Sequence, residues 1–443
     1  MNPVITVIGG GLAGAEAAWQ IARGGCRVRL FEMRPGVTTP AHATGLLGEL
    51  VCSNSLKSNM AGTAPFLLKE ELRRLDSLLL RIADEVKVPA GHALAVDREQ
   101  FARRVTEEIA NLPQVEIVRQ EVREIPSDGT VIVASGPLTS GPLAESVARF
   151  TGTGNLYFYD AISPIVDADT LDRSRLSAAS RYGKGGEDYL NAFLSEEEYA
   201  AFYKALTGAE SAPLHSFEKE LYFEGCLPLE ELARRGFDTL RFGPMKPVGL
   251  VDPRTGKRAY AAAQLRLENL MADSYSLVGF QNHMTFSEQQ RVFRLIPGLE
   301  NAGFTRYGRI HRNSYINAPA VVTATLQTKK RPELFFAGQI CGVEGYVESI
   351  ATGLLAGVNA ARIARGRKAA TPPRETACGS LAHFLVRADP DEFQPANMSF
   401  GLLPEPSAEL RKIRNRRQRR DAQVRLALDS MDRWKAEELR EQN

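Results

Sequence analysis

The amino-acid sequence predicts an α/β protein with a doubly wound, mostly parallel sheet of the Rossmann type and an inserted α+β domain. Three observations support this prediction. A strand–glycine–helix–strand pattern fills residues 1–32, the same kind of pattern returns near residue 334, and the segment of about 156–300 is irregular. Strands that alternate with helices form parallel sheets with right-handed crossovers. We therefore expect a dinucleotide-binding domain built from both ends of the chain.

The N-terminal unit is the clearest part of this pattern. Residues 3–8 form a short β-branched run that suits a buried parallel strand. Helix-forming residues follow over 14–23 until Gly24 and Gly25 end the helix, and 27–32 predicts a second strand.

Later elements are predicted by the same signals. Asp97 and Gln100 resemble an N-cap and capping box that open a helix to about residue 110. Further strands are expected over 115–118, 130–134 and 334–337, and a long helix rich in small residues over 346–365. The predicted domain limits are 1–160 and 301–443 for the two parts of the dinucleotide-binding domain, which ends in a basic helical tail, and 161–300 for the insertion.

Composition indicates an ordinary globular protein. Of 443 residues, 44% are hydrophobic and 24% charged, and the formal net charge is +2. No run approaches the roughly 18–20 apolar residues of a membrane span. Glu16 interrupts the apolar N-terminus, which also lacks a basic leader, so we expect no signal peptide, no membrane association and a cytoplasmic location. The five scattered cysteines contain no CxxC pair, so neither a disulfide framework nor a metal site is expected.

A GxGxxG element stands directly between the first strand and the first helix. Gly9 permits a tight turn, Gly11 lets the backbone approach a pyrophosphate, and Gly14 allows close helix–strand packing. The pyrophosphate would meet free amides at the positive end of the helix dipole. The predicted binding residues are Gly9, Gly10, Gly11, Leu12, Ala13 and Gly14, with Glu32 as acceptor for a ribose 2′-OH.

Glu32 suits an adenosine ribose of FAD or of NAD. The late strand–glycine–helix segment favours FAD, because it places a second helix N-terminus where it could face the flavin ring or ribityl chain. A plain strand–helix unit is the alternative. The flavin contacts expected from this segment are Gly338, Gln339, Gly342, Gly345 and Tyr346.

Two cysteines lie in unusual surroundings. Polar hydroxyls, an amide and Lys57 surround Cys52, and such surroundings can lower a thiol pKa. Cys226 follows Gly225 and precedes Pro228, so it would lie just before a helix, a position that favours the thiolate.

A basic block lies near the C-terminus. Residues 411–420 read RKIRNRRQRR, without an acid. This block indicates either a nucleic-acid contact or a solvated helix face.

The sequence resembles a known family, the folate- and FAD-dependent tRNA (uracil-5-)-methyltransferases (TrmFO). The resemblance covers nearly the whole chain and is weakest after about residue 405. Besides 9–14 it rests on ATGLLGELVCSNSLKS at 43–58, VIVASGPLTS at 131–140, YFEGCLPLEELARRG at 222–236, RFGPMKPVGLVDPRTGK at 241–257, LVGFQNHMTFSEQQRVFRLIPGLE at 277–300 and LFFAGQICGVEGYVESIATGLLAG at 334–357. Ser135 departs from the threonine expected in this family, a change that alters little.

The resemblance implies transfer of a one-carbon unit from methylenetetrahydrofolate to C5 of a uridine in the tRNA T-loop, giving 5-methyluridine. FADH2 would supply the reduction, and NADH or NADPH would reload the flavin. Uracil C5 becomes nucleophilic once a thiolate adds at C6, and a second group must then remove the C5 proton. We expect Cys226 to be the nucleophile and Cys52 the acid/base partner, although the sequence does not distinguish the two roles.

The same resemblance suggests contacts for both substrates. Folate needs a planar stacking group and a cation for its tail, so the candidates are His283, Arg291 and Lys246, with Arg309 or Arg312 weaker. The target base must be extruded from the T-loop. Phosphate contacts would come from exposed basic residues such as Arg411, Lys412, Arg416 and Arg417.

Two other functions are compatible with part of these observations. MnmG-type flavoproteins share the late glycine segment and modify a wobble uridine of tRNA, but they are disfavoured by the surroundings of Cys52 and Cys226. A flavin-containing tRNA-binding protein without catalytic activity is the third possibility. The nicotinamide preference and the oligomeric state stay open.

Overall fold

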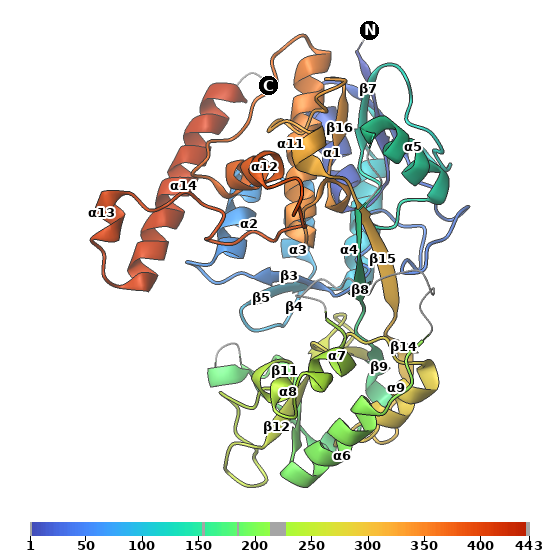
Figure 1. Ribbon diagram of the computed structural model, residues 1–443, viewed down its shortest axis with the longest axis vertical. Helices are drawn as coiled ribbons and strands as arrows, with labels where there is room; N and C mark the ends of the chain where they lie inside the picture. Colours follow the sequence, from blue (N-terminus) through green and yellow to red (C-terminus); the bar gives the residue numbers. More distant parts are fainter. Residues whose placement is uncertain (1, 153–155, 184–185, 213–226, 440–443) are drawn as a thin grey trace.

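The computed structural model describes residues 2–152, 156–183, 186–212 and 227–439. Two lobes are evident in Figure 1, a larger one that holds both ends of the chain and a smaller one built from its middle. The hydrophobic core divides in the same way, because one large cluster unites N- and C-terminal residues and a second cluster runs from Val166 to Ala302.

The larger lobe contains a five-stranded parallel sheet. Its strand order is β16-β7-β1-β2-β6, with bounds Leu334–Phe336, Thr130–Val133, Val4–Ile8, Arg27–Phe31 and Val115–Val118. In the register, Ile5 lies between Val28 and Thr130. The edge strand β16 comes from the last third of the chain, so the parallel sheet and its discontinuous origin are both confirmed.

Helices cover this sheet and extend the lobe. The helices are α1 (Leu12–Arg23), α2 (Ala64–Arg74), α3 (Leu78–Glu85), α4 (Arg98–Ala110), α5 (Gly141–Thr151), α10 (Ala318–Val321), α11 (Tyr346–Ala364), α12 (Ala377–Arg387), α13 (Ala408–Arg411) and α14 (Arg416–Glu438). The predicted N-cap is confirmed, since the Asp97 side chain accepts from the Gln100 amide at 2.9 Å. Small residues on α11 allow it to lie against α1, because a Cβ on Gly353 would stand 2.3 Å from the carbonyl oxygen of Ala13.

The smaller lobe is the predicted α+β insertion. It contains a six-stranded antiparallel sheet, ordered β10-β11-β12-β13-β9-β14, with bounds Leu176–Ala178, Tyr189–Leu194, Ala261–Leu267, Ser274–Leu277, Ile165–Asp167 and Phe304–Arg306. The helices α6 (Glu196–Thr207), α7 (Leu229–Arg234), α8 (Thr239–Phe242) and α9 (Phe286–Phe293) pack on it. Strand β14 extends this sheet beyond residue 300.

Two small sheets connect the lobes. Strands β8 (Leu156–Ala161) and β15 (Ile310–Tyr315) pair antiparallel and carry the chain into and out of the smaller lobe (Figure 1). The strands β3 (Ser55–Ser58), β5 (Ala93–Val96) and β4 (Lys87–Val88) form a three-stranded sheet at the base of the larger lobe.

Among the described residues, no helix is both long and apolar enough to span a membrane. The same residues contain no group of three or more His, Cys, Asp or Glu side chains arranged to hold a metal ion.

Candidate active site

The predicted glycine turn lies at the wall of a long cavity in the larger lobe. Gly9 has φ +104°, and a Cβ on Gly14 would stand 1.8 Å from the carbonyl oxygen of Gly9, so both positions exclude larger residues. Nothing lies within 4 Å of a Cβ built on Gly11, which therefore faces open space. An anionic group has room at this point, at the N-terminus of α1.

The structure brings most of the predicted cofactor residues to this one cavity. Gly9, Gly11, Leu12, Ala13, Glu32, Gly338, Gln339 and Tyr346 line it, together with 120–122 and 134–140. Gly10 contributes its amide, which donates to Glu32 Oε2 at 2.9 Å. Gly342 and Gly345 pack elsewhere, since a Cβ would meet Phe393 at 2.4 Å at the first and Glu348 Oε2 at 2.4 Å at the second.

The Glu32 carboxylate is already well satisfied by the protein. Arg34 donates its backbone amide and Nε to Oε1, each at 2.9 Å, while its terminal nitrogen and the Gly10 amide donate to Oε2. Burial alone would raise the pKa of Glu32, but the hydrogen bonds and charge of Arg34 outweigh it and hold this pKa below its ordinary value. A ribose hydroxyl must therefore share an acceptor that already has protein donors.

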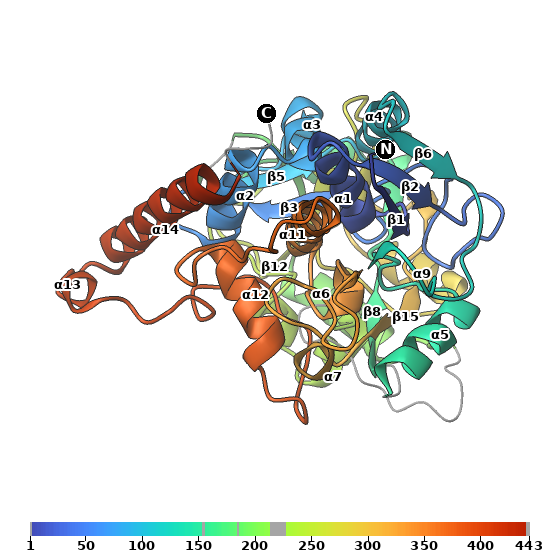
Figure 2. The same ribbon diagram turned by 90° about the horizontal axis from the view of Figure 1, so that it is seen from above.

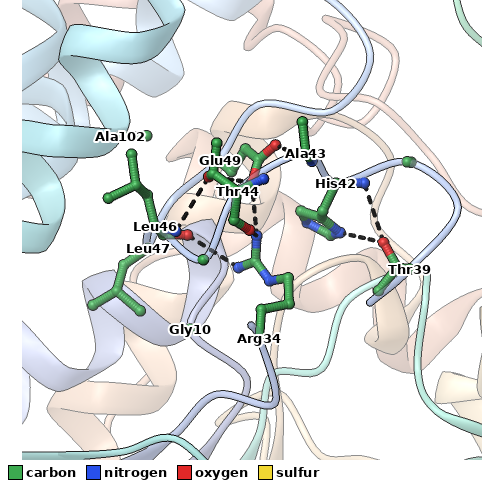
Figure 3. Close-up of polar contacts among 12 residues, drawn as sticks. Gly10, Arg34, Thr39, His42, Ala43, Thr44, Leu46, Leu47, Glu49 and Ala102 are labelled. Atoms are coloured by element: carbon green, nitrogen blue, oxygen red, sulfur yellow. Dashed lines mark hydrogen bonds and ion pairs between the residues drawn. The ribbon is translucent and has the colours of Figure 1, made fainter. Parts of the chain in front are cut away.

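Arg34 also organises the segment that leads to Cys52, as Figure 3 shows. Its guanidinium donates to Glu49 Oε2 at 2.8 Å and to the carbonyl oxygens of Thr44 and Leu46 at 3.2 and 3.1 Å. Glu49 in turn accepts from the amides of Ala43 and Thr44 and from the Thr44 hydroxyl. The only local sequence signal for this network is an arginine two residues after the strand-terminal acid, and Arg34 is not among the predicted site residues.

Cys52 lies beside Tyr346, a residue of the late glycine segment that is expected to contact the flavin. Its amide donates to the Tyr346 hydroxyl at 2.7 Å, and its Sγ lies 3.9 Å from the Ala161 carbonyl oxygen. Burial, reinforced by the charge of Asp160, raises the pKa of the Cys52 thiol well above its ordinary value. The expectation of a lowered pKa is wrong, because the Lys57 ammonium pairs with Glu348 at 2.9 Å and the thiol is desolvated.

Arginines outside the predicted site residues fix the backbone around Cys52. Arg98 donates to the Leu50 carbonyl oxygen at 2.7 Å, and Arg306 of β14 donates to that of Val51 at 2.5 Å. Arg266 of β12 donates to the Asn54 side chain at 2.8 Å. The smaller lobe therefore helps to position the Cys52 segment, which no local sequence pattern indicates.

Cys226 lies outside the described residues, but the helix expected just beyond it is confirmed as α7. The Leu229 amide at its start donates to the Gln281 carbonyl oxygen at 2.8 Å. Glu230 Oε1 accepts from the His283 amide at 2.6 Å. The start of α7 thus packs directly against His283.

His283 is buried, and its Nε2 has no hydrogen-bond partner among the described residues. Burial lowers the pKa of its imidazole, so the ring is neutral at neutral pH. The folate candidates Arg291 and Lys246 are exposed, as is the weaker candidate Arg309. Arg291 pairs with Glu288 at 2.6 Å and donates to the Ala205 carbonyl oxygen of α6. Lys246 lies in a loop, and its own carbonyl oxygen accepts a hydrogen bond from Arg181.

The predicted tRNA contacts Arg411, Lys412, Arg416 and Arg417 are exposed on α13 and the start of α14. Figure 2 shows these helices projecting from the larger lobe, with α13 at the outer tip. Asn415 caps α14 by accepting from the Arg417 and Gln418 amides. Arg411 has a long ion pair with exposed Glu405 at 3.5 Å.

The fold and this cavity define a dinucleotide-binding protein of the GidA class. A family model described as glucose inhibited division protein A matches residues 4–368. GidA of Aquifex aeolicus has the same fold, with a TM-score of 0.70 at 18% identity, covering 98% of this chain and 73% of that one. A second crystal form of that protein gives a TM-score of 0.68.

Closer relatives carry a more specific name. Proteins named methylenetetrahydrofolate–tRNA-(uracil-5-)-methyltransferase TrmFO are similar along almost their whole length. The relative from Solibacter usitatus is 60% identical over 97% of this chain and 96% of its own, and that from Pelotomaculum thermopropionicum is 56% identical over 97% and 98%. The chain belongs to the TrmFO family, as its motifs indicated.

Proposed function

We propose that this chain is a folate-dependent tRNA methyltransferase that uses FAD. It transfers a one-carbon unit from methylenetetrahydrofolate to C5 of the T-loop uridine and forms 5-methyluridine, with NADH or NADPH as reductant. One observation carries the proposal beyond family membership: the Cys52 amide is bonded to Tyr346, a residue of the cavity wall. A thiol therefore lies next to the place where a flavin would bind.

The cavity fits FAD in its chemistry. The open space above Gly11 suits a pyrophosphate, and the second wall, with Gly338, Gln339 and Tyr346, suits the flavin end. When bound there, FADH2 would supply the hydride that reduces the transferred methylene to a methyl group. We place the adenosine ribose near Glu32, where it shares the carboxylate with Arg34.

The raised pKa of the half-buried Cys52 thiol disfavours its thiolate, so we assign the nucleophile to Cys226 and the acid/base role to Cys52. A nucleophile must be a thiolate, and desolvation disfavours the thiolate at Cys52. To remove the C5 proton, Cys52 must first lose its own proton, so this role requires that a neighbouring base accept the thiol proton during the cycle. Asp160 and Glu344, both near Cys52, are further acidic groups of this region.

For folate, neutral His283 offers a flat ring to the pterin, and its Nε2 is available to a ligand in the described part of the chain. Arg291 would have to leave Glu288 before it could bind the glutamate tail, so Lys246 is the better cation. Base extrusion brings the uridine to the thiols, and the basic residues of α13 and α14 contact tRNA phosphates. We place the enzyme in the cytoplasm, where its tRNA substrate occurs.

The test is mass analysis of T-loop nucleosides after incubation of unmodified tRNA with the purified, yellow protein, NADPH and methylenetetrahydrofolate. We expect 5-methyluridine with this donor and none with S-adenosylmethionine. Cys226→Ser should abolish the product and leave the flavin band and its bleaching by NADPH intact. Methylation with S-adenosylmethionine alone, or a product at the wobble uridine, would refute the proposal.

A further inference from the structure

A second cavity, of about 630 Å³, lies between the two lobes. It is bounded by loop 40–46, the start of α4 and the segment 304–309. Its volume falls in the range of about 300–1,000 Å³ that is usual for small-ligand sites. Two residues, His42 and Glu49, line both this cavity and the dinucleotide cavity, so the two spaces adjoin.

The second cavity also adjoins Cys52. Arg306, which lines it, donates to the carbonyl oxygen of Val51, the residue before Cys52. Ile162, also in the lining, follows Ala161, whose carbonyl oxygen lies 3.9 Å from Cys52 Sγ. One layer of backbone therefore separates the cavity from the thiol.

Two aromatic side chains, Phe304 and Tyr307, line one side of this cavity, and Phe286 continues their stack outside the lining. The rings of Phe304 and Tyr307 are nearly parallel, 14° apart with centroids at 5.3 Å, and Tyr307 stacks on Phe286 at 4.5 Å and 17°. The Arg309 guanidinium lies 5.1 Å from the Phe286 ring centre. The stack reaches the surface, since Phe286 is 44% exposed and Arg309 is exposed too.

Two of the cavity's cations lack an acidic partner. Within the described part of the chain, no carboxylate lies within ion-pair distance of Arg306 or Arg309. The third arginine of the cavity, Arg98, is paired with Glu268 at 2.9 Å, and the Glu49 carboxylate is paired with Arg34. The cavity therefore combines two aromatic rings with two arginines, Arg306 and Arg309, that have no carboxylate partner among the described residues. This combination binds bases of single-stranded RNA by stacking and their phosphates by charge.

We propose that this cavity holds a nucleotide next to the target uridine of the tRNA, with its base packed against the Phe304 and Tyr307 side chains that line the cavity and its phosphate at Arg306 and Arg309. The inference rests on the proposed function. It explains how a uracil could reach Cys52 while the neighbouring nucleotide is held one backbone layer away. It also assigns a recognition role to the segment 304–309 at the end of the smaller lobe, which supplies all four of these side chains.

The test compares Tyr307→Leu, Arg309→Ala and Arg309→Lys with a matched control. The control is Arg173→Ala, which removes another exposed arginine placed over an aromatic ring of the same lobe, Tyr275, outside the cavity. Tyr307→Leu and Arg309→Ala should each raise the KM and Kd for tRNA about tenfold, the loss of roughly one base stack or phosphate contact. Arg309→Lys should lose less, and kcat, flavin content and NADPH oxidation without tRNA should stay unchanged.

A T-arm hairpin with an abasic nucleotide beside the target uridine sharpens the test. The wild type should bind it about tenfold more weakly than the intact hairpin, whereas Tyr307→Leu should show no further loss, because the same contact is already missing. Full additivity would overturn the proposal. An effect on the KM for methylenetetrahydrofolate or NADPH instead of tRNA, or a tRNA effect no larger than that of Arg173→Ala, would also overturn it.

Direct tRNA binding separates the two proposals. If the wild type makes no 5-methyluridine but the variants still lose tRNA affinity, the proposed reaction fails and the nucleotide site stands. If the wild type methylates tRNA and the variants bind it normally, the reaction stands and the nucleotide site fails. Thermal unfolding midpoints equal to that of the wild type exclude misfolding as the cause of an affinity loss.

Discussion

Arg34→Met should destabilise the larger lobe severely. The guanidinium is 3% exposed and pairs with two buried carboxylates, Glu32 at 2.9 Å and Glu49 at 2.8 Å. It also satisfies the carbonyl oxygens of Thr44 and Leu46. Removing one partner of a buried ion pair costs about 3–5 kcal/mol, because the remaining charge is left without compensation. The two pairs share one side chain, so their costs are not additive, and we expect a total loss of about 4 kcal/mol, the midpoint of that range. Urea unfolding of the FAD-saturated protein measures this loss.

The loss should depend on pH in a defined direction. In the wild type the lowered pKa of Glu32 contributes stability that is present above the ordinary carboxyl pKa and disappears as pH falls. In Arg34→Met only the backbone amides of Gly10 and of residue 34 still oppose the burial of Glu32, so the pKa of this carboxyl rises relative to the wild type and it takes up a proton more readily. The destabilisation should therefore be largest at pH 8 and smaller at pH 5.

The control is Arg29→Met. Arg29 lies on the neighbouring strand β2, and its pair with Glu116 is exposed on both sides (50% and 59%). Such surface pairs contribute about 0–1 kcal/mol. A cost for Arg34→Met no greater than that of Arg29→Met, or the same cost at both pH values, would refute the argument that the buried network stabilises the Cys52 segment.

Three further outcomes are expected. Cys52→Ala should reduce 5-methyluridine formation by about 10²–10⁴-fold without loss of the flavin band, and retained activity would exclude its acid/base role. Burial raises the pKa of Glu230 to about 7, so the folded state holds a proton that the unfolded state has released, and stability falls as pH rises toward and through 7. Glu230→Gln keeps an oxygen acceptor for the His283 amide and should flatten the pH dependence of stability in thermal unfolding from pH 5 to 8. The variant should be more stable than the wild type by up to about 3 kcal/mol at pH 8, and a stability curve parallel to that of the wild type would contradict this prediction. The double variant Arg416→Ala/Arg417→Ala should weaken tRNA binding and reduce its salt slope by about 1–2, whereas an unchanged slope would remove α14 from the tRNA interface.

The elements with strong local signals were predicted closely. Strand–glycine–helix patterns have fixed geometry over short distances, so β1, α1 and β2 appear within a residue or two of their expected bounds. The helix predicted over 346–365 is also found, and its small residues are the local signal that it packs closely against another helix. These features depend on neighbours in the sequence, which is why the sequence alone reveals them.

The environment of Cys52 could not be predicted in the same way. Lys57 is five residues away in the sequence, but Glu348 and Asn397 hold its ammonium group. The groups that do act on the thiol electrostatically include Asp160, Arg98 and Glu344, which come from separate parts of the chain. A pKa depends on burial and on charges in space, and neither follows from the residues beside a cysteine.

Both lobes hold the segment around Cys52 in position. Arg98 and Arg34 of the larger lobe fix it from one side, while Arg306 and Arg266 of the smaller lobe fix it from the other. Each of these contacts is to backbone or to a polar side chain next to Cys52, so a shift of one lobe against the other would move the thiol relative to Tyr346. The β8–β15 pair that joins the lobes includes Ala161, whose carbonyl oxygen lies beside the same thiol. A tRNA bound to the smaller lobe would therefore act on a segment that also lines the dinucleotide cavity, and this shared segment provides a physical route by which RNA binding could be coupled to chemistry at the flavin.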